Sequence, residues 1–289
     1  MSTRRNPDRD IDANIDERAV IVTGRAHEAA GVKAVMVSLQ RGLQSMGALR
    51  TIAALTKLNQ RHGFDCPGCA WPEEHGGRKV AEFCENGAKA VAEEATKRVI
   101  TPEFFARHTI AELEAQPEFW LSQQGRLTEP MVLRPGAEHY RPIAWDDAFA
   151  LIANELRALE SPHQGVFYTS GRTSNEAAFL YQLLVRSFGT NNLPDCSNMC
   201  HDSSFTALVD AIGIGKGSVT VEDLLLADLI VIAGQNPGTN HPRMLSILEK
   251  AKDNGAKVIA VNPLPEAGLI RFKDPQKLHG VISDGVPIA

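Results

Sequence analysis

The chain has 289 residues, of which 43% are hydrophobic and 22% are charged, and its formal net charge at pH 7 is −5. These values are typical of a folded globular protein with one or two domains, and they exclude a disordered chain. The acidic balance argues against nucleic acid as a partner, and no apolar run approaches the ~18 residues of a membrane span. We therefore expect a cytoplasmic protein that binds no nucleic acid and is not an integral membrane protein.

A polar tail is predicted over residues 1–28, and a helical pattern follows over residues 29–60. The spacing predicts a pair of helices divided near Gly47, whose apolar stripe faces the core or another subunit. A membrane-surface helix is the alternative. The residues of the first stripe, which recur at three and four positions, are Val32, Val35, Met36, Leu39, Leu43 and Met46.

A cysteine knuckle comes next. Cys66 and Cys69 flank Pro67-Gly68 in a tight Cys-x-x-Cys turn, and Cys84 returns fifteen residues after Cys69. Three thiols that converge in this way suit an iron–sulfur cluster, or a zinc ion with His75 as its fourth ligand. A thioredoxin-like redox pair is a third interpretation, although Pro72 and the polar run after it disfavour the helix that such a motif needs. The fourth interpretation is that the three spacings arise by chance.

Turn-rich sequence near residues 123–136 predicts a subdomain boundary, and Trp145 begins a clear amphipathic helix. Beyond Gly165 the pattern is that of an α/β protein. Val166–Thr169 is predicted as a short strand, and the turn that follows it leads into a helix over Asn175–Phe188. Arg172 lies in that turn, where it is either an anion-binding group or a solvated loop arginine.

The stretch that organises the chain contains Cys200 and His201, near the start of another predicted helix. A helix N-terminus and a neighbouring imidazolium both favour the thiolate form of a cysteine. Cys200 is therefore a candidate nucleophile or metal ligand. The competing interpretation is a buried structural cysteine beside an ordinary histidine.

A βαβ unit is the clearest pattern in the chain. A buried strand over Leu229–Ala233 is followed by a helix that ends at Asn254-Gly255, and a second strand begins at Lys257. The loop after the first strand, residues 234–242, has the composition of a phosphate-binding loop. It lacks the G-x-G-x-x-G pattern, and Asn262 stands where a nicotinamide ribose would need a carboxylate. The unit therefore predicts nucleotide binding and disfavours NAD.

The order of the knuckle, the Cys-His pair and the βαβ loop resembles the molybdopterin-guanine-dinucleotide oxidoreductases. These form the formate dehydrogenase and DMSO reductase superfamily, and within it the chain resembles the YdeP-like branch of formate dehydrogenase-type alpha subunits. The resemblance covers about residues 60–280. Its most specific stretches are 65–71, 170–176, 189–204 and 234–242.

The resemblance implies two cofactors, Mo-bis(molybdopterin guanine dinucleotide) and a [4Fe–4S] cluster, and a small substrate such as formate. It places Cys66, Cys69 and Cys84 on the cluster cysteines and Cys200 on the molybdenum ligand. His201 falls on the proton-handling histidine, and Arg172 lies in a substrate-side segment where its fork suits a carboxylate. The residues expected to hold one pterin dinucleotide are Gly234, Asn236, Pro237, Asn240 and Asn262.

Two positions depart from the family pattern. Glu73 stands where the family has its third cluster cysteine, so the ligand set has three cysteines. Asn86 stands where the family has a lysine between cluster and pterin, which puts the passage of electrons in doubt. The relatives are more than twice as long, and residues 284–289 do not look like a natural domain ending. We therefore expect the N-terminal portion of a larger enzyme.

The predicted fold class is α/β, with Rossmann-like parallel-sheet subdomains preceded by a small iron–sulfur subdomain and N-terminal helices. The predicted function is two-electron oxidation or reduction at molybdenum, with electrons relayed through the cluster to an unknown electron-transfer partner. The alternative is a non-enzymatic zinc-knuckle α/β interaction or regulatory module. The expected boundaries are a tail at 1–28, helices at 29–60, the iron–sulfur subdomain at 61–130, and α/β subdomains at 131–196 and 197–289, the second of which appears truncated.

Overall fold

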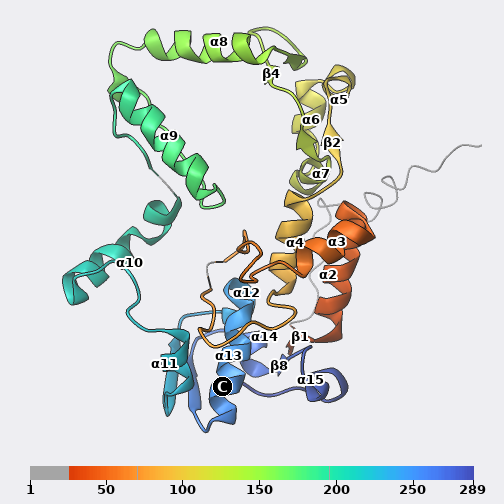
Figure 1. Cartoon of the computed structure of the whole chain (residues 1–289), viewed down its shortest axis with the longest axis vertical. Helices are drawn as coiled ribbons and strands as arrows, with labels where there is room; N and C mark the ends of the chain where they lie inside the picture. Colours follow the sequence, from red (N-terminus) through yellow and green to blue (C-terminus); the bar gives the residue numbers. More distant parts are fainter. Residues whose placement is uncertain (1–25, 70, 195) are drawn as a thin grey trace, which may run out of the picture. The chain divides into compact units, whose positions relative to one another are not determined.

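The chain divides into two units. The first unit comprises residues up to 129, 133–141 and 220–289, and the second comprises 130–132 and 142–219. The structure, a computed structural model, describes residues 26–69, 71–194 and 196–289 (Figure 1). The α/β class is confirmed, because helices and short paired strands alternate along the first unit.

Three helices form one core of the first unit (Figure 1). They are α2 (Gly31–Met46), α3 (Ala48–Leu55) and α4 (Glu85–Glu94). Gly47 separates α2 from α3 with a φ of 73°, a conformation that glycine adopts without strain. The predicted helix pair is therefore confirmed. The core residues between these helices are Met46, Leu55, Leu58, Ala88, Val91 and Ala92.

The face that α2 buries is not the predicted stripe. Met46 is fully buried, whereas Met36 is 65% exposed, and the other stripe residues are exposed as well. The buried positions are mainly small, namely Gly31, Ser38 and Gly42. Small side chains let the backbones of α2 and α4 approach closely, so the packing follows residue size rather than the apolar stripe. The prediction of a core-facing stripe was wrong, and a subunit-facing stripe stays a prediction.

Short elements follow between residues 99 and 127. Strand β2 (Val99–Ile100) pairs in parallel with β3 (Arg126–Leu127). Between them lie α5 (Pro102–Arg107), α6 (Ile110–Glu114) and α7 (Glu118–Gln123). Helix α5 begins at Pro102, because proline suits the first helical position.

The predicted βαβ unit is confirmed. Strand β6 (Leu229–Ala233) pairs in parallel with β7 (Lys257–Val261), and α12 (Pro237–Asn240) and α13 (Pro242–Asp253) lie between them in sequence. The short helix α11 (Val221–Leu225) precedes β6. Ile230 and Ile232 belong to the same buried core as residues of α13.

Strand β6 is buried on only one face, which corrects the prediction of a fully buried strand. Leu229 and Val231 are more than half exposed, because the helices of this unit cover the other face. Among the described residues every sheet has two strands, so a larger Rossmann-like sheet stays a prediction. The first unit ends with α14 (Ala267–Ile270), β8 (Phe272–Lys273) and α15 (Leu278–Ile282), and β8 pairs with β1 (Ala29–Ala30).

The second unit is mostly helical. It contains β4 (Met131–Val132), α8 (Trp145–Arg157), the 3₁₀ helix η1 (Pro162–Gln164), α9 (Asn175–Phe188) and α10 (Cys196–Ile212), and β5 (Arg141–Pro142) lies at its boundary. The boundaries of α9 match the predicted ones, because Ser174 caps its start and Gly189, in the left-handed region, follows its end.

The predicted strand Val166–Thr169 does not form as a regular strand. The Phe167 N–H donates a hydrogen bond to the Asn192 carbonyl at 2.9 Å, and Val166 and Tyr168 are 68% and 54% exposed. A strand needs a neighbour that satisfies its backbone in a continuous ladder, and the described residues form no such ladder along this segment, although Thr169 makes a single bridge.

Candidate functional site

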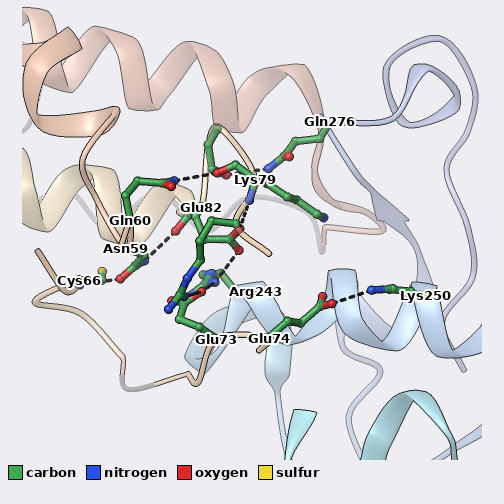
Figure 2. A network of polar contacts seen from close by, with 12 residues as sticks. Asn59, Gln60, Cys66, Glu73, Glu74, Lys79, Glu82, Arg243, Lys250 and Gln276 are labelled. Atoms are coloured by element: carbon green, nitrogen blue, oxygen red, sulfur yellow. Dashed lines mark hydrogen bonds and ion pairs between the residues drawn. The ribbon is translucent and has the colours of Figure 1, made fainter. Parts of the chain in front are cut away.

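The cysteine knuckle is anchored by Asn59. The Oδ1 atom of Asn59 accepts a hydrogen bond from the Cys66 N–H at 2.8 Å, and its Nδ2 donates to the Glu82 carbonyl at 2.7 Å (Figure 2). Asn59 has a φ of 56° and is only 5% exposed. Asparagine tolerates this backbone region better than most residues. It therefore ties the segment before the knuckle to the segment that leads into Cys84, a role that the sequence did not reveal.

The thiols of Cys66 and Cys84 lie beside Gly87. Cys84 is the N-cap of α4, and its sulfur accepts from the Gly87 N–H at 3.4 Å. A Cβ atom at Gly87 would lie 2.8 Å from the Cys66 sulfur and 3.9 Å from the Cys84 sulfur. The missing side chain of Gly87 therefore leaves the space that both sulfurs border.

Burial raises the pKa of the Cys84 thiol above its ordinary value of 9.0, and negative charge at Cys66 and Cys69 adds to that rise, whereas the Gly87 N–H lowers it. The charges of Cys66 and Cys69 thus both act on the Cys84 thiol. Thiolates cost free energy at such a site unless a cation balances them, which is the chemistry of a metal or cluster ligand set.

Arg243, on α13, holds the loop after the knuckle. Its Nη1 donates to Glu73 Oε1 at 2.5 Å, its Nη2 donates to Glu73 Oε2, and Nη2 also lies 2.6 Å from Glu82 Oε1 (Figure 2). Arg78 adds a second cation, 2.5 Å from Glu73 Oε2. The side chains of Arg243, Glu73 and Glu82 are 13–17% exposed. Forked pairing of this kind, shielded from water, fixes geometry as well as charge.

Glu73, a member of this network, stands at the position where the resemblance predicts a third cluster cysteine. Glu73 is bound by two arginines, so its carboxylate is already engaged. His75, the proposed fourth zinc ligand, is 82% exposed, and its Nδ1 lies 3.1 Å from Glu222 Oε2. Across the described ranges 26–69, 71–194 and 196–289, no three His, Cys, Asp or Glu side chains are arranged to hold a metal ion. The cysteines fit a cluster by donor chemistry and by the space at Gly87, and the ligand set itself stays a prediction.

The predicted nucleotide loop lies in the same unit. Gly234 has a φ of 66°, Pro237 is buried, and Asn236 caps α12 by accepting from the Thr239 N–H at 3.1 Å. The Nδ2 atom of Asn236 also donates to Glu266 at 2.5 Å. Asn240 is the last residue of α12. After β7, Asn262 accepts from the Leu264 N–H at 3.0 Å, so it shapes its own turn.

One hydrogen bond joins the knuckle to this loop. The Nδ2 atom of Asn86, two residues past Cys84, donates to the Thr239 carbonyl at 3.2 Å. A cavity of about 340 Å³ is lined by Cys84 and Asn86 on one side and by Gly238 on the other. Its wall also includes Asp274, which is 2% exposed and whose Oδ2 has no hydrogen-bond partner among the described residues.

The remaining predicted site residues lie in the second unit. Arg172 is exposed, and its N–H donates to Ser170 Oγ at 3.3 Å. His201 is exposed and interrupts α10 with a φ of −121°. Cys200 lies in the same helix, as predicted, and its side chain is outside the part of the chain that the structure describes.

The family model for molybdopterin oxidoreductases matches residues 126–275 of the chain. This is just over half of its 289 residues. The chain belongs to the molybdopterin oxidoreductase family. The resemblance that the motifs predict is therefore confirmed.

Relatives support the same assignment. An uncharacterized oxidoreductase of Mycobacterium tuberculosis is 77% identical over 281 residues, which cover 97% of this chain and 36% of the relative. The YdeP protein of Escherichia coli is 46% identical over 253 residues, 88% of this chain and 33% of its own length. An F420-dependent formate dehydrogenase alpha subunit of Methanococcus maripaludis is 32% identical over 145 residues, 50% of this chain and 21% of that subunit.

The chain thus spans about a third of the length of its most similar relatives among these. Family membership implies a molybdenum–pterin cofactor. Within the described residues, no helix of this molybdopterin oxidoreductase chain combines the length and the apolar character needed to cross a membrane.

Proposed function

We propose that the chain forms the cluster-binding and dinucleotide-binding part of a formate dehydrogenase-like molybdenum oxidoreductase. The observation that supports this most directly is the link between the two predicted cofactor segments. The Asn86–Thr239 hydrogen bond, 3.2 Å long, connects the residues after Cys84 with the loop after β6. Cluster and dinucleotide would then be held by neighbouring parts of one unit.

The proposed cofactors are Mo-bis(molybdopterin guanine dinucleotide) and a [4Fe–4S] cluster. When bound, the molybdenum–pterin group supplies a metal centre that exchanges two electrons with a substrate. Cys66, Cys69 and Cys84 would bind the cluster through thiolates, and Cys200 would supply the soft sulfur ligand that molybdenum favours. Because Glu73 is engaged by arginines, a fourth cluster ligand would come from elsewhere or be absent.

The dinucleotide would be held by the loop after β6. Gly234, with its positive φ, lets the backbone turn after β6. Asn236 is held by its hydrogen bonds to Thr239 and Glu266. Pro237, Asn240 and Asn262 complete the proposed set. A preorganised loop loses little conformational entropy on binding, which favours a large ligand of this kind.

Arg172 and His201 have the proposed roles on the substrate side. The guanidinium of Arg172 suits a small carboxylate such as formate, because its planar fork matches two carboxylate oxygens. The exposed imidazole of His201 would accept or relay the substrate proton at a ring nitrogen. We also propose a cytoplasmic location, a small-molecule substrate, a separate electron-transfer partner and no nucleic-acid partner.

The experiment that tests this proposal is metal analysis of full-length protein purified without oxygen, with Cys66→Ser/Cys69→Ser and Cys200→Ser variants beside it. We expect the double variant to lose iron and the Cys200→Ser variant to lose molybdenum or to change its electron paramagnetic resonance signal. The alternative, a zinc-knuckle module, predicts colourless protein with one zinc per chain and an unaffected Cys200→Ser variant.

A further inference from the structure

A basic hollow lies beside the cysteine knuckle. It measures about 500 Å³ and is bordered by the turn after α3 on one side and by Gly77 and Arg78 on the other. None of its lining residues is acidic, although the whole chain carries a net charge of −5. The lining residues are Thr56, Lys57, Gln60, Arg61, His62, Gly77 and Arg78.

The cations of this hollow are available to a partner. Lys57, Arg61 and His62 are exposed, and among the described residues neither Lys57 nor Arg61 has an ion pair. Arg78 is partly neutralised by Glu73. Neighbouring cations without ion pairs repel one another. An anionic partner surface would reduce that repulsion and stabilise them.

The hollow is connected to the thiols by the backbone. The Lys57 carbonyl accepts from the Phe64 N–H at 3.2 Å, and Asn59 in the same turn accepts from the Cys66 N–H. Phe64 is 42% exposed, so it offers an aromatic contact near the cations. An exposed aromatic residue with surrounding cations is a composition that protein interfaces favour.

We propose that this hollow is the docking site of an acidic one-electron carrier protein. The inference rests on the proposed function, because it places the carrier next to the three cysteines that would hold the cluster. Interfaces of electron carriers are small and depend on electrostatic attraction for rapid association. The hollow supplies that attraction next to the segment that carries Cys66.

Other anions fit less well. Nucleic acid is an extended polyanion that needs a long basic stripe, whereas the basic lining of this hollow consists of Lys57, Arg61, His62 and Arg78. Sites for a free phosphate usually provide backbone N–H groups or enclosed walls, whereas this hollow presents long exposed side chains. A protein surface that presents a few carboxylates would suit a hollow whose basic lining residues are Lys57, Arg61, His62 and Arg78.

The test measures binding to full-length, cofactor-loaded protein, with an oxidised plant-type ferredoxin as the acidic probe and no turnover. At an ionic strength of about 0.01 M, where the screening length is about 30 Å, we expect Lys57→Glu/Arg61→Glu to raise Kd at least about 10-fold. The matched control Lys33→Glu/Lys257→Glu makes the same charge change at two exposed lysines outside the hollow and should raise Kd less than about 2-fold.

Equal losses in both variants would mean that total charge alone attracts the probe, and the inference would be wrong. It would also be wrong if tripolyphosphate or a DNA oligonucleotide bound through Lys57 and Arg61 while the ferredoxin did not. The neutral variant Lys57→Gln/Arg61→Gln should give a smaller loss in the same direction. Iron analysis of the purified full-length protein before the assay separates the two proposals. Absence of iron would refute the cluster, whereas iron-containing protein in which Lys57→Glu/Arg61→Glu leaves Kd unchanged would refute the docking site alone.

Discussion

Arg243 forms a bidentate ion pair with Glu73 through both terminal nitrogens of its guanidinium, although the two residues are 170 positions apart in the chain. The pair joins α13 of the βαβ unit to the loop that follows the cysteine knuckle. It also occupies the carboxylate at the position where the family has a cluster cysteine. The knuckle is thus fixed to the βαβ unit by charge.

Replacing Arg243 with glutamine should destabilise the protein by about 2–3 kcal/mol, because it leaves Glu73 and Glu82 largely buried with less compensation. The matched control is Lys250→Gln, which removes an ion pair to Glu74 in which the lysine is 49% exposed. That change should cost less than about 1 kcal/mol. Urea unfolding of both variants measures their free energies of unfolding. Equal decreases would show that the Arg243 network contributes no more to stability than the exposed Lys250–Glu74 pair.

Gly87→Ala should reduce iron binding without unfolding the protein. Alanine favours a helix over glycine by about 1 kcal/mol, but its Cβ would lie 2.8 Å from the Cys66 sulfur and displace it. The measurements are iron per chain and the thermal midpoint. We expect the iron to fall while the midpoint stays the same or rises.

The control for that prediction is Gly42→Ala in α2, whose Cβ would lie 2.6 Å from Thr51 Cγ2, away from the thiols. Overpacking there should cost about 1–3 kcal/mol and leave the iron content of the folded protein unchanged. Iron loss in both variants to the same degree would indicate that general destabilisation, not the position of Cys66, controls the cluster.

Glu222 should titrate far below an ordinary glutamate. The His75 N–H, which donates to Glu222 Oε1 at 2.6 Å, is the main cause that lowers the pKa of Glu222 from 4.5 to about 2. A lowered folded pKa stabilises the protein above pH 4.5, and this contribution is lost as the pH falls from 4.5 towards 2. Glu222→Gln should remove that part of the acid dependence.

Carboxyl carbon shifts in a nuclear magnetic resonance titration measure this pKa directly. His75→Ala keeps the backbone N–H, so the pKa of Glu222 should stay well below 4.5 in that variant. A return to 4.5 would mean that the imidazole of His75, and not its backbone, holds the carboxylate.

Local signals in the sequence predicted local structure well. Ser174 and Gly189 mark the two ends of α9, and the alternation of strand, helix and strand over 229–261 gave the parallel pair β6–β7. Such signals act within a few residues, so they can be read without the rest of the chain.

Features that depend on distant residues were missed. The apolar stripe with Met36 and Leu39 predicted the wrong face of α2, because the helix buries Ser38 and Gly42 instead, and Gly42 lies against Thr51 of α3. Nothing near Arg243 indicates that its partners are Glu73 and Glu82, and Asn59 became a candidate only through its two hydrogen bonds. These contacts are decided by tertiary packing, which a local pattern does not contain.

We propose that this chain holds a cluster and a pterin dinucleotide in neighbouring segments. The decisive measurement is elemental analysis by mass spectrometry on full-length protein purified anaerobically. We expect molybdenum or tungsten together with several irons per chain, and loss of the iron in Cys66→Ser/Cys69→Ser. Zinc alone, retained when Cys200 is replaced by serine, would contradict it and establish the knuckle as a structural zinc site.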